Sequence, residues 1–280
     1  MRSYGHRLST LVAQRGPLCV GVDPHPQLLH RWGLDTNVAG LERCARGLVA
    51  ALGEHVAVLK PQSAFFEAYG SAGIAVLERV LADIKAAGAL SILDVKRGDI
   101  GSTLDAYAAA YLAESSPLAA DAVTLSPYLG FGSLRSAIDL AGATGRGVYV
   151  LALTSNPEGR ELQHAVTAAG VGVAESVIAS AAAVNRDGLD DELGHVGVVV
   201  GATIGRTGVD FSALRGSILA PGLGAQGARA ADLADVFGPA LPWVLPSVSR
   251  EVMAAGPDPA ALQDAARGLL VTIEAVMDLG

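Results

Sequence analysis

Short apolar runs alternate with longer amphipathic segments along the whole chain. Eight of these runs are almost continuously hydrophobic, which is typical of strands that are covered on both faces. They occupy residues 18–23, 55–61, 90–96, 122–127, 148–154, 196–203, 217–222 and 243–248. The pattern therefore predicts eight strands of a parallel sheet.

The segments between the runs have helical periodicity. Residues 72–87 place apolar side chains at helical spacing, and further helices are predicted over 103–115, with Ser102 as N-cap, 173–186 and from Asp258-Pro259 onwards. Eight strands that alternate with helices predict one (β/α)₈ barrel, a single domain over residues 1–280. A doubly wound open sheet is the alternative, but no Gly-x-Gly-x-x-Gly turn follows the first strand.

One connection, from Ser155 to Gly172, is longer than the others. Loops of this length without structure of their own are often lids or binding loops. The other interpretation is a short extra helix over residues 161–168. The pattern does not decide between the two.

Composition and charge exclude several classes of partner. The net charge is −8 over 280 residues, so we expect no binding to nucleic acid or to an anionic membrane surface. No apolar run reaches the ~20 residues of a membrane span, and the first residues lack the apolar core of a signal peptide. The two cysteines, Cys19 and Cys44, form no metal-binding pattern, which favours a reduced, cytoplasmic protein.

The chain has three lysines and seventeen arginines, and two of the lysines end predicted strands. A lysine kept in such a composition indicates a need for an ammonium group, which can deliver a proton when guanidinium cannot. Asp94 and Lys96 are two residues apart on one strand, so their side chains share a face. Asp94, Lys96 and Lys60 therefore predict a functional charge cluster, with a structural ion network as the alternative.

Other polar residues also lie at predicted strand ends, where such barrels build their active sites. Asp23 ends the first strand, Thr154 and Ser155 end the fifth, and Arg250 follows the eighth. The glycine-rich stretch 222–227 follows the seventh strand and precedes a helix. Its backbone N–H groups and Arg250 predict an anion site of the kind that binds phosphate.

These residues resemble a known family. The motif Asp94-x-Lys96-x-x-Asp99-Ile100, with Lys60 on the preceding strand and Pro221-Gly-x-Gly-Ala-Gln226-Gly227 downstream, resembles orotidine 5′-phosphate decarboxylase. The long fifth loop and Ser249-Arg250 look most like its longer bacterial, mycobacterial-type branch. The resemblance runs from Asp23 to Arg250 and implies cofactor-free, metal-free conversion of orotidine 5′-phosphate to uridine 5′-phosphate in pyrimidine biosynthesis.

The resemblance also implies a role for each matching residue. Lys96 would protonate C6 of the pyrimidine within a Lys60, Asp94, Lys96 and Asp99 network, in a homodimer where Asp99 reaches the neighbour's site. The implied substrate contacts are Asp23 and Lys60 on the ribose, Thr103 from the neighbour, Ser155 (or Thr154) on the ring, and Gln226 and Arg250 on the phosphate. Either loop 155–172 or loop 224–232 would close over the substrate.

The chemistry agrees with these roles, because a vinyl carbanion without π-delocalisation needs a fixed positive charge beside it and then a proton. Two other functions stay open. One is a metal-dependent sugar-phosphate lyase of the same barrel superfamily, whose members carry an acidic metal ligand where this chain has Lys60. The other is a barrel that binds nucleotides without catalysis.

Overall fold

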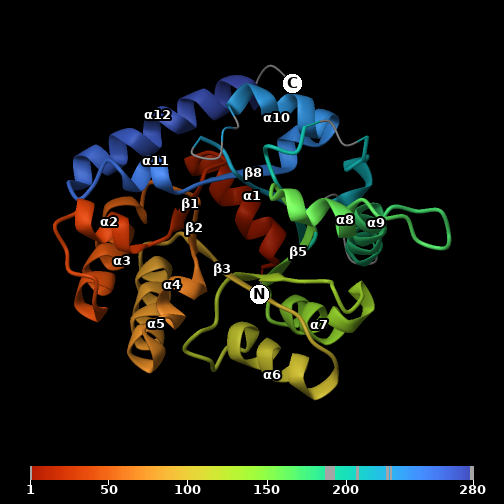
Figure 1. Cartoon of the computed structure of the whole chain (residues 1–280), viewed down its shortest axis with the longest axis horizontal. Helices are drawn as coiled ribbons and strands as arrows, with labels where there is room; N and C mark the ends of the chain where they lie inside the picture. The colour runs from red at the N-terminus through yellow and green to blue at the C-terminus, as the bar shows by residue number, and fades with distance from the viewer. Residues whose placement is uncertain (1, 187–192, 206–207, 225–226, 228, 278–280) are drawn as a thin grey trace.

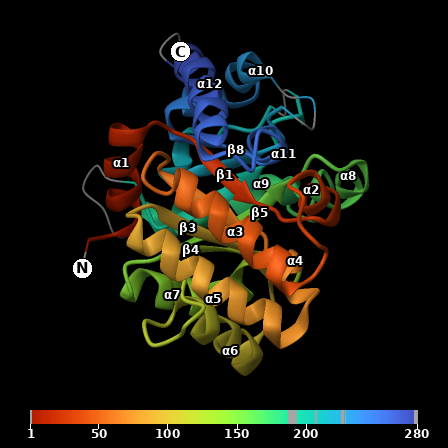
Figure 2. The ribbon, with the colours of Figure 1, turned by 90° about the vertical axis from the view of Figure 1, so that its left-hand side faces the viewer.

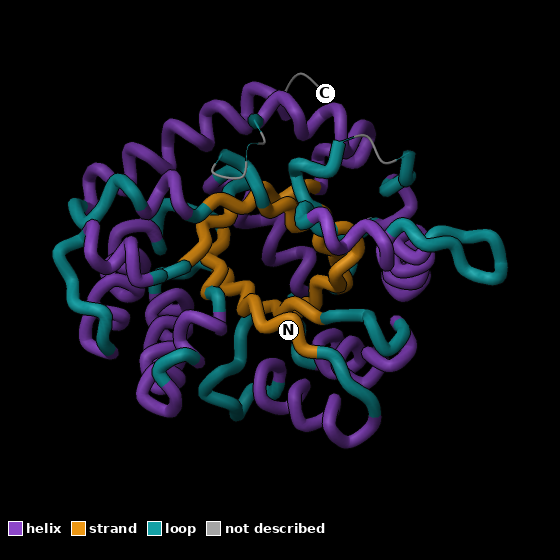
Figure 3. The backbone as a smooth tube through the Cα atoms, in the orientation of Figure 1, coloured by secondary structure: helices purple, strands orange, loops and turns teal. Residues whose placement is uncertain are grey.

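The computed structural model describes residues 2–186, 193–205, 208–224, 227 and 229–277. Within them, eight parallel strands form one closed barrel in the order β1 to β8, which confirms the predicted (β/α)₈ fold (Figure 3). The strands are β1 Cys19–Val22, β2 Val58–Pro61, β3 Leu90–Arg97, β4 Ala122–Leu125, β5 Gly147–Leu153, β6 Val196–Val200, β7 Ile218–Pro221 and β8 Val244–Val248.

Helices surround this barrel on its outside (Figure 1). The α-helices are α1 Tyr4–Arg15, α2 Pro26–Arg31, α3 Val38–Leu52, α4 Ser63–Glu67, α5 Gly70–Ala86, α6 Gly101–Leu112, α7 Arg135–Ala143, α8 Arg160–Gln163, α9 Val173–Arg186, α10 Ala230–Phe237, α11 Arg250–Met253 and α12 Pro259–Met277. Short 3₁₀ helices are η1 Phe131–Leu134, η2 Pro157–Gly159, η3 Ser212–Leu214 and η4 Gly238–Trp243. None of the described helices is both long and apolar enough to cross a membrane.

Two local predictions need correction. Ser102 is not the N-cap of α6, because the helix begins one residue earlier, at Gly101, after an extended Ile100. The connection 155–172 contains only the single turns η2 and α8, and then an isolated antiparallel bridge between Val166 and Gly172. A helix over 161–168 does not form. The segment extends away from the barrel beside α9 (Figure 1).

The barrel interior is apolar at one end and polar at the other. A buried cluster takes at least one residue from each strand, among them Val58, Ile92 and Ala122. Side chains two positions further along a strand point to the same face. The same inward alternation therefore brings Lys60, Asp94 and Thr124 to the carboxyl end of the barrel, above this apolar layer.

Helix α1 covers the opposite, amino end of the barrel (Figure 2). The hydroxyl oxygens of Tyr4 and Tyr149 lie 3.0 Å apart. Arg7 forms an ion pair with Asp121, which lies just before β4. Asp121 also accepts hydrogen bonds from the backbone N–H and hydroxyl of Ser91, at 2.9 and 3.0 Å. These contacts attach α1 to β3 and β4.

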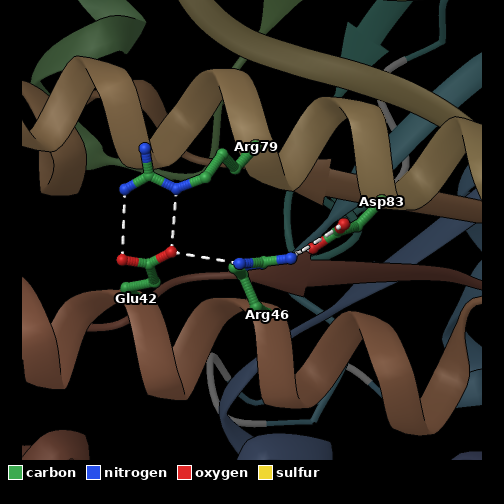
Figure 4. A network of polar contacts seen from close by, with 4 residues as sticks. All are labelled: Glu42, Arg46, Arg79 and Asp83. Carbon is green, nitrogen blue, oxygen red and sulfur yellow. Dashed lines mark hydrogen bonds and ion pairs between the residues drawn. The ribbon is translucent and has the colours of Figure 1, made fainter.

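A polar network joins α3 and α5 on the outside of the barrel (Figure 4). Arg79 binds both carboxylate oxygens of Glu42, at 2.8 and 3.1 Å, and Arg46 bridges Glu42 and Asp83. All four side chains are 30 to 44% exposed, so water screens their charges. The core beneath α3 and α5, rather than these ion pairs, holds the helices in place.

Candidate active site

A cavity of about 330 Å³ opens at the carboxyl end of the barrel. Strand ends and the loops after them form its wall, as expected for this fold. Predicted site residues in the wall are Asp23, Lys60, Asp94, Lys96, Ser155 and Arg250, together with Thr154 and Gly222. The structure therefore brings residues from positions 23 to 250 into one cavity.

Asp94 lies between the two lysines. Its Oδ2 is 3.1 Å from Nζ of Lys60, and its Oδ1 is 2.6 Å from Nζ of Lys96. The side chains of Lys60 and Asp94 are 9 and 11% exposed, while that of Lys96 is 46% exposed. Lys96 is thus the member of this chain of charges that is open to the cavity.

Neighbouring charges keep the buried pair ionised. Burial raises the pKa of Asp94, but Lys60 and Lys96 outweigh this effect and hold that pKa at about 2. Burial lowers the pKa of Lys60, and the carboxylates of Asp94 and Asp23 more than compensate, so its pKa lies above the usual value. At neutral pH the site therefore holds a fixed carboxylate between two cations.

Lys96 also has an unusual backbone. Its φ is +47°, in the left-handed region that non-glycine residues rarely adopt. The pairing of β3 with β4 is irregular at this point, between Leu93 and Arg97. Such conformations and bulges occur preferentially next to active sites, where they redirect a side chain.

Asp23 and Arg250 lie in the cavity wall, directly after β1 and after β8. The Oδ1 atom of Asp23 is buried and has no hydrogen-bond partner among the described residues. Arg250 is the exposed first residue of α11. Nearby, Gly224 has φ +74°, and a Cβ there would lie 2.1 Å from the carboxyl carbon of Glu251. The positive φ favours glycine at this position, whereas the end of the flexible Glu251 side chain could move away from a Cβ.

Gln226, the other predicted phosphate ligand, lies outside the described residues. The same holds for parts of loop 224–232. The closure of loop 155–172 or loop 224–232 therefore stays a prediction.

The end of β5 distinguishes Thr154 from Ser155. Gln163 binds Thr154 twice, accepting from its backbone N–H at 2.8 Å and donating to its hydroxyl oxygen at 2.7 Å. The Thr154 hydroxyl in turn donates to Asn156, at 2.6 Å. Thr154 is thus engaged within its own loop, while Ser155 is exposed at the cavity.

Asp99 and Thr103 do not line the cavity of their own chain. Asp99 accepts a hydrogen bond from the backbone N–H of Ile100, at 2.8 Å, and Thr103 is exposed on α6. Exposed apolar side chains follow the ends of β3 and β4: Ile100, Tyr128 and Leu129, at 62, 75 and 52% exposure. Of the predicted network that included Asp99, one chain therefore brings together Lys60, Asp94 and Lys96.

Comparison with known proteins gives the family. The sequence model of the "Orotidine 5′-phosphate decarboxylase / HUMPS family" matches residues 16–265. The chain belongs to this family. It is 61% identical over 277 residues to the orotidine 5′-phosphate decarboxylase of Salinispora arenicola, covering 99% of each chain. It is 54% identical over 273 residues to that of Streptomyces coelicolor, covering 98% of each.

Solved structures agree with this assignment. A crystal structure from Streptomyces avermitilis is 55% identical, with a TM-score of 0.96 over 99% of this chain and 97% of the other. The OMP decarboxylase of Leishmania donovani is 31% identical, with a TM-score of 0.78 over 99% of each chain. The fold of this chain is thus shared with both of these structures.

Sequence reasoning missed one residue of this family member's site. Thr124, on β4, is 1% exposed and contacts both Asp94 and Lys96. Thr124 lies two residues after Ala122 on the inward face of β4, so the alternation of side chains along the predicted strand would have found it.

Metal ligands are a separate question. The described residues contain no group of three or more His, Cys, Asp or Glu side chains that could hold a metal ion. The carboxylate of Asp94 already pairs with two ammonium groups. Whether the reaction needs a metal is a matter for experiment.

Proposed function

We propose that the chain catalyses the cofactor-free decarboxylation of orotidine 5′-phosphate to uridine 5′-phosphate, in de novo pyrimidine biosynthesis. The observation that carries this proposal is the arrangement Lys60–Asp94–Lys96 at the cavity, with its 3.1 and 2.6 Å contacts. Family membership and the names of the relatives support it. The enzyme would work in the cytoplasm, where the buried thiols of Cys19 and Cys44 stay reduced.

In the proposed reaction, the bond between C6 and the substrate carboxylate breaks and CO₂ leaves. The electron pair of that bond stays on C6. The ammonium of Lys96 stabilises this negative charge and then donates a proton to C6. The neutral amine regains its proton from water. Asp94 holds Lys96 in place and keeps it charged, so little reorganisation is needed during the reaction.

The remaining cavity residues would bind the rest of the nucleotide. The buried, unpartnered Oδ1 of Asp23 suits a ribose hydroxyl, with Lys60 beside it. Arg250 would clamp the phosphate together with Gln226. Ser155, exposed in the cavity wall after β5, would contact the pyrimidine.

We further propose that the enzyme is a homodimer in which each subunit completes the other's site. Asp99 and Thr103 lie outside their own cavity. Ile100, beside Asp99, and Tyr128 and Leu129 after β4 are large apolar side chains that are exposed in one subunit, and a second subunit would cover them. A two-fold axis through this surface would make the exchange of Asp99 and Thr103 reciprocal.

Lys60 argues against the metal-dependent sugar-phosphate alternative. A fixed ammonium at this position, 3.1 Å from Asp94, repels a divalent cation and occupies a carboxylate oxygen that could bind it. Binding of nucleotide without turnover is the other alternative. The exposure of Lys96 to the cavity favours catalysis, since a merely structural ion pair needs no open ammonium.

The decisive experiment follows the absorbance of orotidine 5′-phosphate after addition of the enzyme, with and without EDTA. We expect loss of the substrate absorbance at the same rate in both. Turnover that disappears with EDTA and returns with Mg²⁺ would favour metal-dependent chemistry. Tight binding of the nucleotide without any change in absorbance would identify a non-catalytic protein.

A further inference from the structure

Thr124 lies on β4, next to the part of β3 that carries Asp94 and Lys96. Its hydroxyl oxygen lies 2.8 Å from Oδ1 of Asp94 and 2.9 Å from the backbone nitrogen of Lys96. The side chain is 1% exposed and still forms part of the cavity wall. One buried hydroxyl therefore contacts both the carboxylate of Asp94 and the backbone of Lys96, the proton donor of the proposed reaction.

The direction of these hydrogen bonds is fixed by chemistry. The N–H of Lys96 can only donate, so the hydroxyl oxygen of Thr124 must accept from it. The single hydroxyl hydrogen is then directed towards Asp94, whose Oδ1 must accept it. This arrangement suits an ionised carboxylate, because Oδ1 also accepts from the ammonium of Lys96 at 2.6 Å.

The hydroxyl also replaces a backbone partner. At the irregular pairing between β3 and β4, the Lys96 N–H donates to this side chain rather than to a strand carbonyl. Lys96 is the residue with φ +47°. A left-handed non-glycine residue is unfavourable unless its surroundings hold it there. The bond to Thr124 is one such restraint, and it sets where the lysine side chain begins.

We propose that Thr124 is a positioning residue that orients both the Asp94 carboxylate and the Lys96 backbone, so that the ammonium faces the reacting carbon. This inference rests on the proposed function. Thr124 itself acts through its neighbours: Lys60 from β2 and Lys96 from β3 are the charges that face Asp94, and Asp23, directly after β1, faces Lys60.

Two substitutions separate positioning from packing. Thr124→Val keeps the shape of the side chain and removes the hydroxyl. Thr124→Ser keeps the hydroxyl and removes a methyl group from a buried position. If Thr124 positions the lysine, the valine variant should lose about 10- to 100-fold in kcat with little change in KM, because small misplacements near the chemistry have effects of this size. The serine variant should keep most of the kcat and have a lower Tm.

A matched control exists on the same two strands. Ser91 on β3 exchanges hydrogen bonds with Asp121, just before β4, in a partly buried hydroxyl–carboxylate contact at the other end of the barrel. Ser91→Ala should lower Tm and leave kcat unchanged. A valine variant with wild-type kcat, or a serine variant that loses as much kcat as the valine variant, would overturn the positioning role.

The test also separates this inference from the proposed function. If Lys96→Ala is inactive and Thr124→Val is fully active, only the role of Thr124 is wrong. If the wild-type enzyme itself does not decarboxylate the substrate, the proposed function has failed. Calorimetric titration with uridine 5′-phosphate checks that each variant still folds and binds the product.

Discussion

Two aspartates at opposite ends of the same pair of strands, Asp94 buried and Asp121 partly buried, have different surroundings. At the carboxyl end, Asp94 pairs with Lys60 and Lys96 and accepts from Thr124. At the amino end, Asp121 pairs with Arg7 and accepts from Ser91. Each aspartate therefore contacts a cation and a hydroxyl from a β-strand. The difference between them lies in the type of cation and in how accessible that cation is.

That difference separates an arrangement that suits the proposed chemistry from a structural one. The Arg7 guanidinium, on α1, donates hydrogen bonds to Asp121 and to the carbonyl of Gly145, so it joins the helix to two loops. A guanidinium cannot usefully lose a proton. The Lys96 ammonium is held on one side by Asp94, and almost half of its side chain remains exposed. An ion pair that fixes a cation yet leaves it accessible can take part in chemistry, while one that ties two elements together stabilises the fold.

Removing each cation should give the largest contrast. Lys96→Ala should lower kcat at least about 10³-fold, because both charge stabilisation and the proton donor are lost. Arg7→Ala should leave kcat unchanged and reduce the free energy of unfolding by about 1–3 kcal/mol, since Asp121 loses a partner. Steady-state kinetics and urea unfolding measure the two effects.

Lys85, exposed on α5, provides the control for loss of a lysine, and Lys85→Ala should change neither quantity. Activity of Lys96→Ala within about tenfold of wild type, only ~1.4 kcal/mol in barrier, would contradict the proton-donor role. Loss of kcat in Arg7→Ala would mean that the two ends of the barrel are not independent.

Mixing of subunits should show that only the carboxyl end is shared between chains. Lys96→Ala and Asp99→Asn homodimers should each be nearly inactive. In a mixed dimer one site carries both changes and the other carries neither. Random exchange should therefore restore about a quarter of wild-type activity per site, since about half the dimers are mixed. No recovery, although mass spectrometry shows exchange, would place Asp99 in its own subunit's site.

Arg250 tests whether the phosphate also binds at the carboxyl end. Arg250→Ala should lower kcat/KM for orotidine 5′-phosphate by about 10- to 100-fold, the usual effect of losing hydrogen bonds to a charged group. The same change should barely affect any slow reaction of orotidine, which has no phosphate. Equal losses for the two substrates would assign Arg250 a structural role.

Acid should reveal the ionisation of Asp94 as a modest effect on stability. Its folded pKa of about 2 lies below the unfolded value of ~3.9, so its contribution is complete above about pH 5 and is lost as the pH falls through 2. The difference in free energy of unfolding between wild type and Asp94→Asn should shrink by about 2 kcal/mol between pH 5 and pH 2. A constant difference, measured by urea unfolding, would mean that the two lysines do not depress this pKa.

Much of the fold could be predicted because strands buried on both faces leave an unambiguous pattern. All eight predicted strands form, and the helix predicted over 173–186 has those bounds. The start of α6 could not be predicted, since a cap depends on backbone angles that a serine in the sequence does not determine. The pattern could not decide between a loop and a helix after β5 for a related reason: the structure of this connection depends on contacts of Gln163 with Thr154, nine positions apart.

The charged part of the site could be predicted because lysine is rare in this chain and each lysine at a strand end is conspicuous. Thr124 could not be found in this way, since a threonine in a strand is ordinary. Its role depends on the irregular pairing of β3 with β4 and on the left-handed Lys96, which only the folded structure reveals. The shared position of Asp99 came from family resemblance, and one subunit alone does not test it.

The scarcity of lysine has a practical consequence for handling this protein. Lys60 is buried, so the accessible side-chain amines among the described residues are those of Lys85 and Lys96. Reagents that couple proteins to beads, dyes or sensor surfaces through primary amines have few targets here, and one of them lies in the cavity. Attachment through an engineered surface cysteine would leave the nucleotide site open, as both native thiols are buried.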